Sequence, residues 1–426
     1  MTIASKRPTR AGRTSSLALL TAAAAMLASA PAYAQVQLDF WDMIWGPPEY
    51  IDAAEAIVEQ FNEEHPDIQV TYRSVPWANW YQTFVTAVGA GSAPDVSTGA
   101  GYQAVQLYDM GAIRPIDDVI EELRAEGDLD DFIDGTVETL RYDGHYVALP
   151  WGLDIRVWYY RESILEEAGI EVPSNFEEMR AAAAAATGGD VYGLVSSGDT
   201  GGTHYAFSAM LNNGGGLFDE DRNLTLTSER NMEAMQWLAD MVADGSVHPA
   251  SPGYSSDDRR AAFFQGQAAF TIDNPGLDGA AGEEIAADIG IVPPLEGFHG
   301  DKGTIFWVNN IMMYEQTEHP EEAKTFLKWW SQNQLPLWTE GNTTQMPARK
   351  SFVEAAVGDR ENYRYIVENY LPVGKTTGYA AEGIFPELSE IEGEGVMQTL
   401  IQQLWQGRDL NEIMEQAESR MQDIMR

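Results

Sequence analysis

The chain has 426 residues, of which 66 are acidic and 26 basic, and its formal net charge at pH 7 is −40. A charge of this sign disfavours binding to nucleic acid or to an anionic lipid surface, because phosphate groups attract basic surfaces. The sequence contains no cysteine, which excludes disulfides, thiolate metal sites and a cysteine nucleophile.

The first 34 residues have the pattern of a signal peptide. Basic residues at 6, 7, 10 and 13 precede an apolar run from Leu17 to about Ala30, and a small-x-small motif follows at residues 32–34. We predict cleavage after Ala34 and release into the periplasm; the alternative is an uncleaved anchor. The apolar run is shorter than the roughly 20 residues that span a bilayer. No cysteine follows Ala34 to carry a lipid, so we do not expect a lipoprotein or any insertion into the membrane.

Strands and helices alternate along the first part of the mature chain. Residues 36–40 alternate apolar and polar side chains, which predicts a strand. The elements predicted next are a helix at 51–61, a strand at 68–72, a helix at 80–88 and a strand at 94–96. Such alternation predicts βαβ units built on a largely parallel sheet.

A second unit is predicted from about residue 144. Its strands are expected at 145–149, 155–160, 268–272, 289–292 and 307–314, with helices at 162–168, 176–186 and 232–242 and a mostly helical chain after Pro320. The mature length of about 390 residues favours two domains. Because no flexible linker separates the two units, we expect the chain to cross between them more than once.

Aromatic residues gather beside predicted turns and not inside apolar periodic runs. In an open α/β sheet, positions after strand ends face the ligand crevice. A sugar ring offers an apolar face to an indole and a rim of hydroxyls to polar side chains, so aromatic and polar residues in one crevice are typical of sugar capture. For any single tryptophan, a place in the core is an equally good interpretation. The residues in question are Trp41, Trp45, Trp77, Trp80, Tyr81, Tyr102, Trp151 and Trp307.

Motifs of catalysis and metal binding are missing from the sequence. It has no G-x-S-x-G elbow, no H-E-x-x-H, no phosphate-binding loop and no G-x-G-x-x-G fingerprint. The six histidines lack the spacing of metal ligands. We therefore predict no enzyme, no cofactor and no metal, although 66 acids leave open a pair of carboxylates that could hydrolyse a glycoside.

Several short motifs occur in an order that resembles one protein family. They include Phe40-Trp41, the run at residues 61–68, the stretch at 91–96, Leu149-Pro150-Trp151 and the Met-Pro-Ala-Arg stretch at 346–349. In this order the chain resembles the extracellular solute-binding proteins of bacterial ABC importers, a family that includes the maltose- and trehalose-binding proteins. The motifs span nearly all of the mature chain and say little about which sugar is bound.

The resemblance implies a two-lobe, type II periplasmic-binding-protein fold. Each lobe is expected to be a mainly parallel sheet flanked by helices, with several hinge crossings. We predict an N-terminal lobe of residues 35–150 plus 268–315 and a C-terminal lobe of 151–267 plus 316–426. The implied function is capture of a mono- or oligosaccharide by a monomer that delivers it to the transmembrane subunits of an ABC permease.

The resemblance also suggests the side chains that touch the ligand. Asp154 and Arg156 share one face of an extended segment, and Arg156 has an alternative role as the ion-pair partner of a neighbouring acid. Trp307 is where the family stacks an aromatic residue on the sugar. The predicted ligand-binding set is Trp45, Glu49, Trp80, Tyr102, Asp154, Arg156, Asn274, Trp307 and Arg349.

Two other functions stay open at this point. The first is a secreted carbohydrate-active enzyme, which would convert the sugar into a product. A binding protein, by contrast, releases the sugar unchanged. A protein that binds polyamines or another cationic solute would line its crevice with carboxylates and no donors, whereas Arg156 and Arg349 favour a sugar or an anionic sugar derivative.

Overall fold

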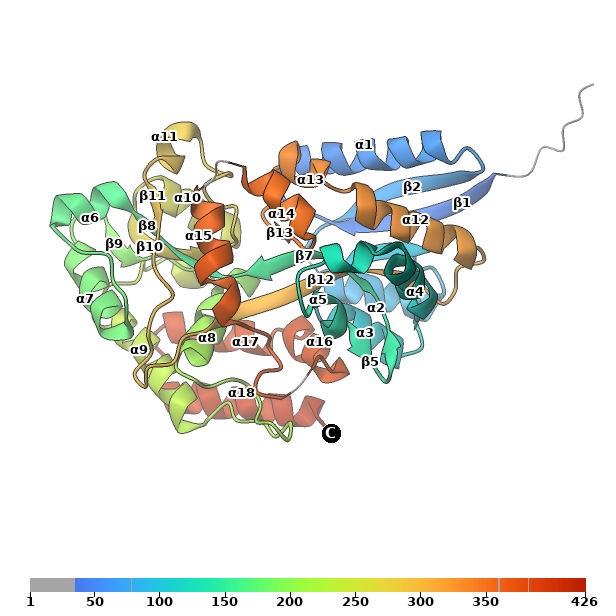
Figure 1. Ribbon diagram of the computed structural model, residues 1–426. Helices are drawn as coiled ribbons and strands as arrows, with labels where there is room; N and C mark the ends of the chain where they lie inside the picture. The colour runs from blue at the N-terminus through green and yellow to red at the C-terminus, as the bar shows by residue number, and fades with distance from the viewer. Residues whose placement is uncertain (1–34, 78, 359–360, 382) are drawn as a thin grey trace, which may run out of the picture.

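A computed structural model describes residues 35–77, 79–358, 361–381 and 383–426 of the chain (Figure 1). The predicted signal peptide lies outside the described residues. Two separate β-sheets and a short hairpin organise the fold. Within the described ranges, no helix combines the length and the apolar character needed to cross a membrane.

The larger sheet has eight strands, and its main path runs β13-β7-β12-β3-β1-β2, with β4 and β14 also paired to β12. The strands β1, β2 and β3 are parallel, so their carboxyl ends meet at one edge. The strand bounds are β1 Val36–Met43, β2 Ile68–Val75, β3 Val96–Gly99, β4 Ile113–Arg114, β7 Leu149–Ile155, β12 Thr304–Tyr314, β13 Met346–Pro347 and β14 Gly374–Lys375.

The smaller sheet has four strands in the order β11-β8-β10-β9. Its bounds are β8 Val157–Arg161, β9 Tyr192–Leu194, β10 Ala268–Asp273 and β11 Ile289–Ile291. The strands β5 (Arg141–Tyr142) and β6 (His145–Tyr146) form the separate hairpin.

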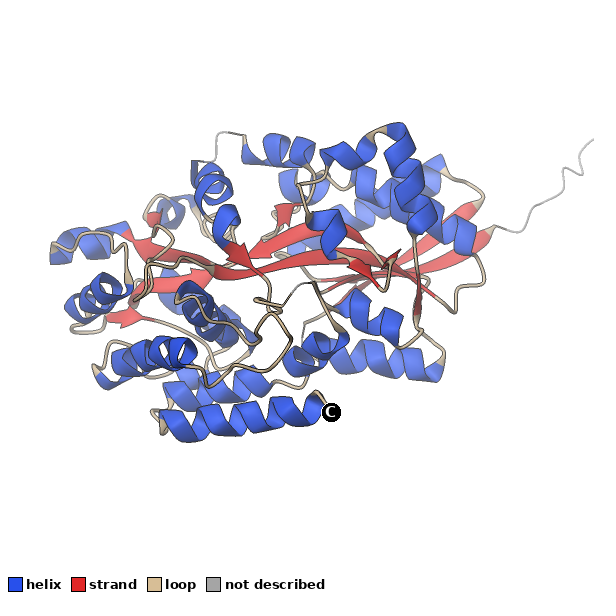
Figure 2. Cartoon of the chain, turned by 60° about the horizontal axis from the view of Figure 1, so that its bottom comes forward, coloured by secondary structure: helices blue, strands red, loops and turns tan. Residues whose placement is uncertain are grey.

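Helices cover both faces of the strands (Figure 2). Helices α1, α12 and α13 pack together over the larger sheet, while α8, α9, α17 and α18 pack together beside the smaller sheet. The helix bounds are α1 Pro48–Glu64, α2 Trp80–Ala90, α3 Gln103–Asp109, α4 Asp117–Glu126, α5 Thr136–Thr139, α6 Glu162–Ala168, α7 Phe176–Ala186, α8 Thr200–Asn212, α9 Glu229–Ala243, α10 Ser256–Phe264, α11 Glu283–Ala286, α12 Pro320–Asn333, α13 Pro336–Thr339, α14 Lys350–Val357, α15 Glu361–Asn369, α16 Pro386–Gly393, α17 Val396–Trp405 and α18 Leu410–Ile424, with short 3₁₀ turns at η1 Asp128–Asp131, η2 Ser251–Gly253 and η3 Leu371–Val373.

The core of α1 illustrates how the sequence pattern becomes packing. Its buried side chains, which include Ala54, Ile57, Val58 and Phe61, recur every three or four residues. A helix of 3.6 residues per turn places such positions on one face. That face covers β2, and Phe61 also packs edge-on against Phe326 of α12.

The chain passes between the two sheets at the junction of β7 and β8. Ile155 ends β7 in the larger sheet, Val157 begins β8 in the smaller one, and Arg156 alone lies between them. The chain returns from the smaller sheet into β12, which runs antiparallel to β7. Helix α16 contacts α3 on one side and α17 and α18 on the other, so it also joins the two halves.

Two expectations about the sheets are wrong. Both sheets are mixed and not mainly parallel, because β10 runs antiparallel to β8 in the smaller sheet and β12 runs antiparallel to β7 in the larger one. The predicted N-terminal lobe includes residues 268–315, yet β10 and β11 in this range pair with β8 in the smaller sheet. Likewise α12, α13 and β13, assigned to the C-terminal lobe, pack with the larger sheet. Local patterns predict a strand but not the sheet that it joins.

Candidate functional site

A row of aromatic rings follows the carboxyl edge of the parallel strands. Trp45 comes after β1, Trp77 and Trp80 come after β2, and Tyr102 comes after β3. The ring centroids are 4.8 Å apart for Trp45 and Trp77, 6.2 Å for Trp77 and Trp80, and 6.1 Å for Trp80 and Tyr102. These are distances of direct aromatic contact. The predicted grouping of Trp45, Trp80 and Tyr102 is therefore present in the structure.

The turn after β3 comes very close to β12. A Cβ atom added to Gly101 would lie 3.0 Å from Cβ of Trp307 and 3.2 Å from the backbone nitrogen of Val308. Only glycine permits this approach without displacing the strand. The close approach brings Tyr102 and Trp307 into one neighbourhood.

The hinge residue Arg156 forms a buried ion pair with Asp154. Arg156 Nη2 donates to Asp154 Oδ2 at 2.9 Å, and Nη1 donates to Oδ1. The pair is almost fully buried, with side-chain exposures of 6% and 11%. A bidentate arginine–carboxylate contact is geometrically specific. Arg156 therefore forms the ion pair that the alternative interpretation predicts, and it also keeps its place in the candidate site.

Arg156 also contacts the second half of the molecule through His204 of α8. Arg156 Nε donates to His204 Nδ1 at 2.7 Å. Burial, together with the charges of Arg156 and Arg259, lowers the pKa of His204 well below its ordinary value. The imidazole is therefore neutral at neutral pH, with Nδ1 acting as an acceptor.

Trp307 lies between this ion pair and a carboxyl group of α16. The guanidinium carbon of Arg156 lies 5.0 Å from the Trp307 ring centroid, a cation–π distance. Trp307 Nε1 donates to Glu392 Oε1 at 3.4 Å. Burial raises the pKa of Glu392 to about 7, although hydrogen bonds from Trp307, Tyr102 and Thr377 oppose the rise. Tyr102 thus links the aromatic row to the polar cluster.

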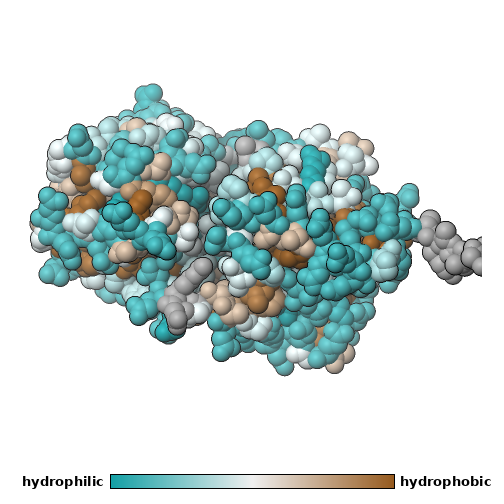
Figure 3. Space-filling model, turned by 90° about the horizontal axis from the view of Figure 1, so that it is seen from above, coloured by the Kyte–Doolittle hydropathy of each residue, from teal (hydrophilic) through white to brown (hydrophobic). Residues whose placement is uncertain are grey.

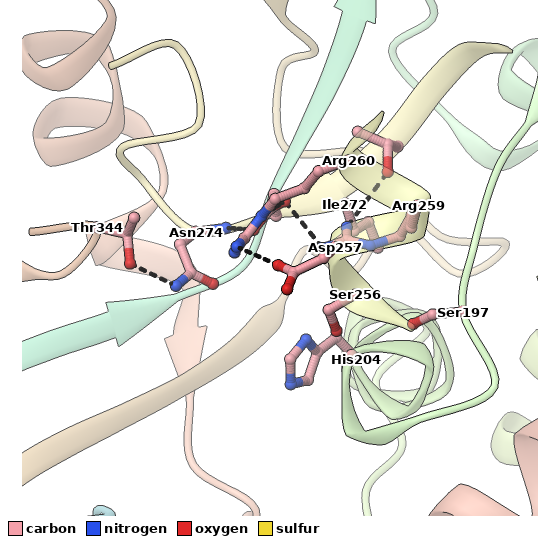
Figure 4. A network of polar contacts seen from close by, with 12 residues as sticks. Ser197, His204, Ser256, Asp257, Arg259, Arg260, Ile272, Asn274 and Thr344 are labelled. Atoms are coloured by element: carbon pink, nitrogen blue, oxygen red, sulfur yellow. Dashed lines mark hydrogen bonds and ion pairs between the residues drawn. The ribbon is translucent and has the colours of Figure 1, made fainter. Parts of the chain in front are cut away.

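A second charged group lies at the end of β10, in the smaller sheet (Figure 4). Arg259 and Arg260 of α10 both bond to Asp273, through Nη2 at 2.8 Å and Nε at 2.7 Å respectively. Burial would raise the pKa of Asp273, yet the two arginines hold it below its usual range. Asp273 and, to a smaller extent, the charge of Asp154 raise the pKa of Arg260, so this group borders the polar cluster.

Asn274 ties the end of β10 to the aromatic row. Its Nδ2 donates to Thr344 Oγ1 at 2.9 Å, and Thr344 Oγ1 donates to the carbonyl of Trp45 at 3.1 Å (Figure 4). The structure therefore places Asn274 at the boundary between the two halves, but with its side-chain amide already bonded within the protein.

Two predicted site residues lie elsewhere. Glu49 is exposed in the first turn of α1, and no contact brings it to the cluster. Arg349 is buried in an ion-pair group of its own, where it donates to Asp128, Asp131 and the carbonyl of Ser331. With its donors used in this way, the structure does not bring Arg349 to the site, and its role as a ligand contact stays a prediction.

The polar cluster as a whole can accept and donate hydrogen bonds around an aromatic face. It contains a carboxylate in Asp154, a guanidinium in Arg156, an imidazole in His204 and a carboxyl group in Glu392, all beside Trp307. In the part of the chain that the structure describes, no group of three or more His, Asp or Glu side chains is arranged to hold a metal ion.

The sequence matches a family model described as bacterial extracellular solute-binding protein over residues 47–334. The chain belongs to this family. The resemblance based on the motifs is therefore confirmed. Membership of this family supports the role of a solute-binding component of a transporter and not that of a carbohydrate-active enzyme.

Solved structures support the fold of this solute-binding protein. A sugar transporter protein from Arthrobacter chlorophenolicus, solved with bound laminaribiose, is 32% identical, with 91% of this chain and 99% of that chain covered and a TM-score of 0.86. A T. maritima protein with maltose bound is 19% identical, covers 91% of this chain and 99% of its own, and has a TM-score of 0.78. The predicted two-lobe α/β fold is thereby confirmed.

Curated relatives of this solute-binding protein are more distant. An arabinooligosaccharide-binding protein of Halalkalibacterium halodurans is 25% identical over 321 residues, which cover 69% of this chain and 66% of the relative. A putative binding protein of Brucella abortus is 27% identical over 274 residues, 63% of this chain and 66% of the relative. The alignments span just under two thirds of these relatives.

Sequence reasoning missed His204, Arg260 and Glu392. Each lies on a helix, where neither periodicity nor a motif distinguishes it from a surface or core residue. Trp77 is one of the aromatic residues beside predicted turns and is absent from the predicted ligand-binding set, although it contacts both Trp45 and Trp80.

Proposed function

We propose that this solute-binding protein captures an uncharged saccharide between its two lobes and delivers it to an ABC importer. The observation that supports this proposal is the position of Trp307. Its indole lies among Arg156, His204 and Glu392, so an apolar face and several hydrogen-bonding groups are available at one place. A sugar ring needs this combination, because its C–H face is apolar and its rim carries hydroxyls.

The balance of charges favours an uncharged ligand. Asp154 and Asp273 are each paired with arginine, and burial keeps Glu392 partly protonated near pH 7. The cluster therefore presents no excess of free carboxylates, which a polyamine would need. This observation counts against the cationic-solute alternative. The arginines are equally engaged by carboxylates, so a strongly anionic sugar is also disfavoured.

The relatives point to the same class of ligand. The structure from Arthrobacter chlorophenolicus that is 32% identical holds laminaribiose, and the Halalkalibacterium relative is named for arabinooligosaccharides. A disaccharide or a short oligosaccharide is therefore the ligand class to test first. The non-enzymatic role requires that the sugar be returned unchanged.

The lobes of the proposed mechanism follow the two sheets. We assign residues 35–155 and 304–357 to the first lobe and residues 157–291 and 361–426 to the second, with Arg156 at the hinge. Strand β14 is the exception within the last range, because it pairs with β12 of the larger sheet. The outline of the molecule narrows between these two halves (Figure 3). Ligand that contacts both lobes would favour the closed arrangement through its differential affinity. The closed monomer then docks on the transmembrane subunits of the permease.

The periplasmic location is part of the same proposal. It rests on family membership and on the predicted cleavage after Ala34. Determination of the N-terminal residue of the exported protein tests it, and Gln35 is expected. An N-terminus at Met1 would contradict cleavage.

A thermal-shift and calorimetry screen tests the function. Laminaribiose, maltose and arabinooligosaccharides are added to the mature protein, with spermidine as the cationic comparison. A ligand at 100 times its Kd stabilises the folded state by about 2.7 kcal/mol, and the recovered sugar should be chemically unchanged. Binding of spermidine without binding of any saccharide would contradict the proposal, and so would conversion of the sugar.

A further inference from the structure

We propose that closing the two lobes on a sugar takes up one proton, which binds to Glu392, so that capture is tighter in mild acid than at neutral pH. This inference rests on the proposed function and adds its regulation by pH. It concerns the contact between α16 and the first lobe, where Glu392 lies beside Trp307 and Tyr102.

Glu392 connects the two lobes through its side chain. It lies on α16, which packs against α17 and α18 of the second lobe and against α3 of the first. Its carboxyl group accepts a hydrogen bond from Trp307 Nε1 at 3.4 Å and another from Tyr102, and both donors belong to the first lobe. Separation of the lobes would break both bonds and return the carboxyl group to water. The environment of Glu392 therefore differs between the open and the closed arrangement.

The cluster around Trp307 holds two carboxyl groups but only one guanidinium. Arg156 bonds to Asp154 through Nη1 and Nη2 and to His204 through Nε, so all three of its nitrogens are engaged. The charge of Arg156 also acts on Glu392, yet among the described residues no cation forms an ion pair with Glu392. When two carboxyl groups share one cation, ionisation of the second is disfavoured. Glu392 is the group left without a partner, so it holds its proton more tightly than it would in water.

The other charged groups nearby do not supply the missing cation. Arg259 and Arg260 are both bonded to Asp273. The neighbouring acids on α16 add negative charge, which also opposes ionisation of Glu392. The titratable and charged groups around Glu392 are Tyr102, Asp154, Arg156 and His204 in the cluster, Glu390 and Glu394 on its own helix, and Arg259, Arg260 and Asp273 beyond Asp154.

The sign of the pH effect follows from this burial. Desolvation raises the pKa of Glu392 to about 7, against an ordinary value of 4.5 in water. Closure therefore favours the protonated form, and the proton comes from the solvent, to which the side chain keeps partial access. The contribution of this proton to sugar affinity is fully present below pH 4.5 and is lost as the pH rises through about 7.

Calorimetry at several pH values tests the inference. The Kd of laminaribiose is measured from about pH 5.5 to about pH 7.5 for the wild type and for Glu392→Gln, whose side chain has nearly the same shape but does not titrate. We expect the wild-type affinity to fall about tenfold over this range, whereas the affinity of the variant should change much less. Titrations in buffers of different ionisation enthalpy count the protons directly. At about pH 6 the wild type should take up about one proton for each sugar bound.

Glu387→Gln is the matched control. It removes the same charge from the first turn of α16, where Glu387 acts on Tyr142 of the β5–β6 hairpin, and its pH dependence should match that of the wild type. A wild type that binds the sugar with a pH-independent Kd and no proton uptake would overturn this inference alone, and so would full pH dependence in Glu392→Gln. A wild type that binds none of laminaribiose, maltose and arabinooligosaccharides at any of these pH values would overturn the proposed function as well.

Discussion

The Nε atom of Arg156 lies 2.7 Å from Nδ1 of His204, which joins the single residue between β7 and β8 to helix α8 of the second lobe. A guanidinium only donates, so the imidazole accepts and stays uncharged. The same guanidinium holds Asp154 and lies 5.0 Å from the Trp307 ring centroid. Arg156 therefore connects the hinge, the second lobe and the proposed sugar platform.

Replacement of Arg156 by alanine should destabilise the protein strongly. It leaves the carboxylate of Asp154 buried without its partner, and breaking a buried pair in this way costs about 3–5 kcal/mol. The free energy of unfolding in urea measures the loss. Arg124→Ala is the control, because Arg124 pairs with Glu121 on the surface of α4 and such pairs contribute little. Equal, small losses in both variants would show that the buried pair does not stabilise the fold.

Trp307→Phe should weaken sugar binding while the protein stays folded. The variant keeps an aromatic face but loses the indole donor to Glu392, and a loss of about 1–2 kcal/mol in binding free energy is expected for such a contact. Trp329→Phe is a matched control, because it also removes an indole donor to a glutamate, Glu64, but on the outside of the first lobe. Laminaribiose calorimetry distinguishes the two. Wild-type affinity in Trp307→Phe would remove this contact from the site.

Asp42 should make stability depend on pH. It is completely buried, and burial raises its pKa to about 7 against hydrogen bonds from Thr98, Tyr50 and Tyr72. The folded state thus holds this proton more tightly than the unfolded state, in which Asp42 has the ordinary aspartate pKa of 3.8. The stabilisation is fully present below pH 3.8 and is lost as pH rises through about 7.

Asp42→Asn removes this titration. Between pH 4 and 7 the wild type should lose up to about 1.4 kcal/mol of unfolding free energy per pH unit relative to the variant. Urea unfolding at several pH values measures the difference. Parallel pH profiles for the two proteins would mean that Asp42 does not carry the raised pKa.

Arg349→Ala should lower stability without changing sugar affinity. The Arg349 side chain is 2% exposed, and it donates to Asp128, Asp131 and the Ser331 carbonyl. Its loss leaves the half-buried carboxylates of Asp128 and Asp131 and the buried Ser331 carbonyl without this donor, and should cost about 1–3 kcal/mol. Lys350→Ala, which breaks a neighbouring surface pair with Asp134, is the control. A large loss of laminaribiose affinity in folded Arg349→Ala would return Arg349 to the site.

The sequence by itself determined the fold family, the aromatic row and part of the polar cluster. Strand ends are visible as breaks in apolar alternation, and parallel strands place the residues after those ends at one edge, so Trp45, Trp80 and Tyr102 could be grouped. Asp154 and Arg156, two residues apart on an extended segment, share a face for the same local reason.

Only the tertiary structure decided which distant residues complete the site. His204 on α8 and Glu392 on α16 meet Trp307 from 103 and 85 positions away in the sequence, a closeness that results from packing and leaves no local pattern. The partner of Arg349, Asp128, lies 221 positions away. The sheet that β10 joins could not be predicted from the sequence either. The apolar alternation of a strand indicates which of its faces is buried and not which strand it pairs with.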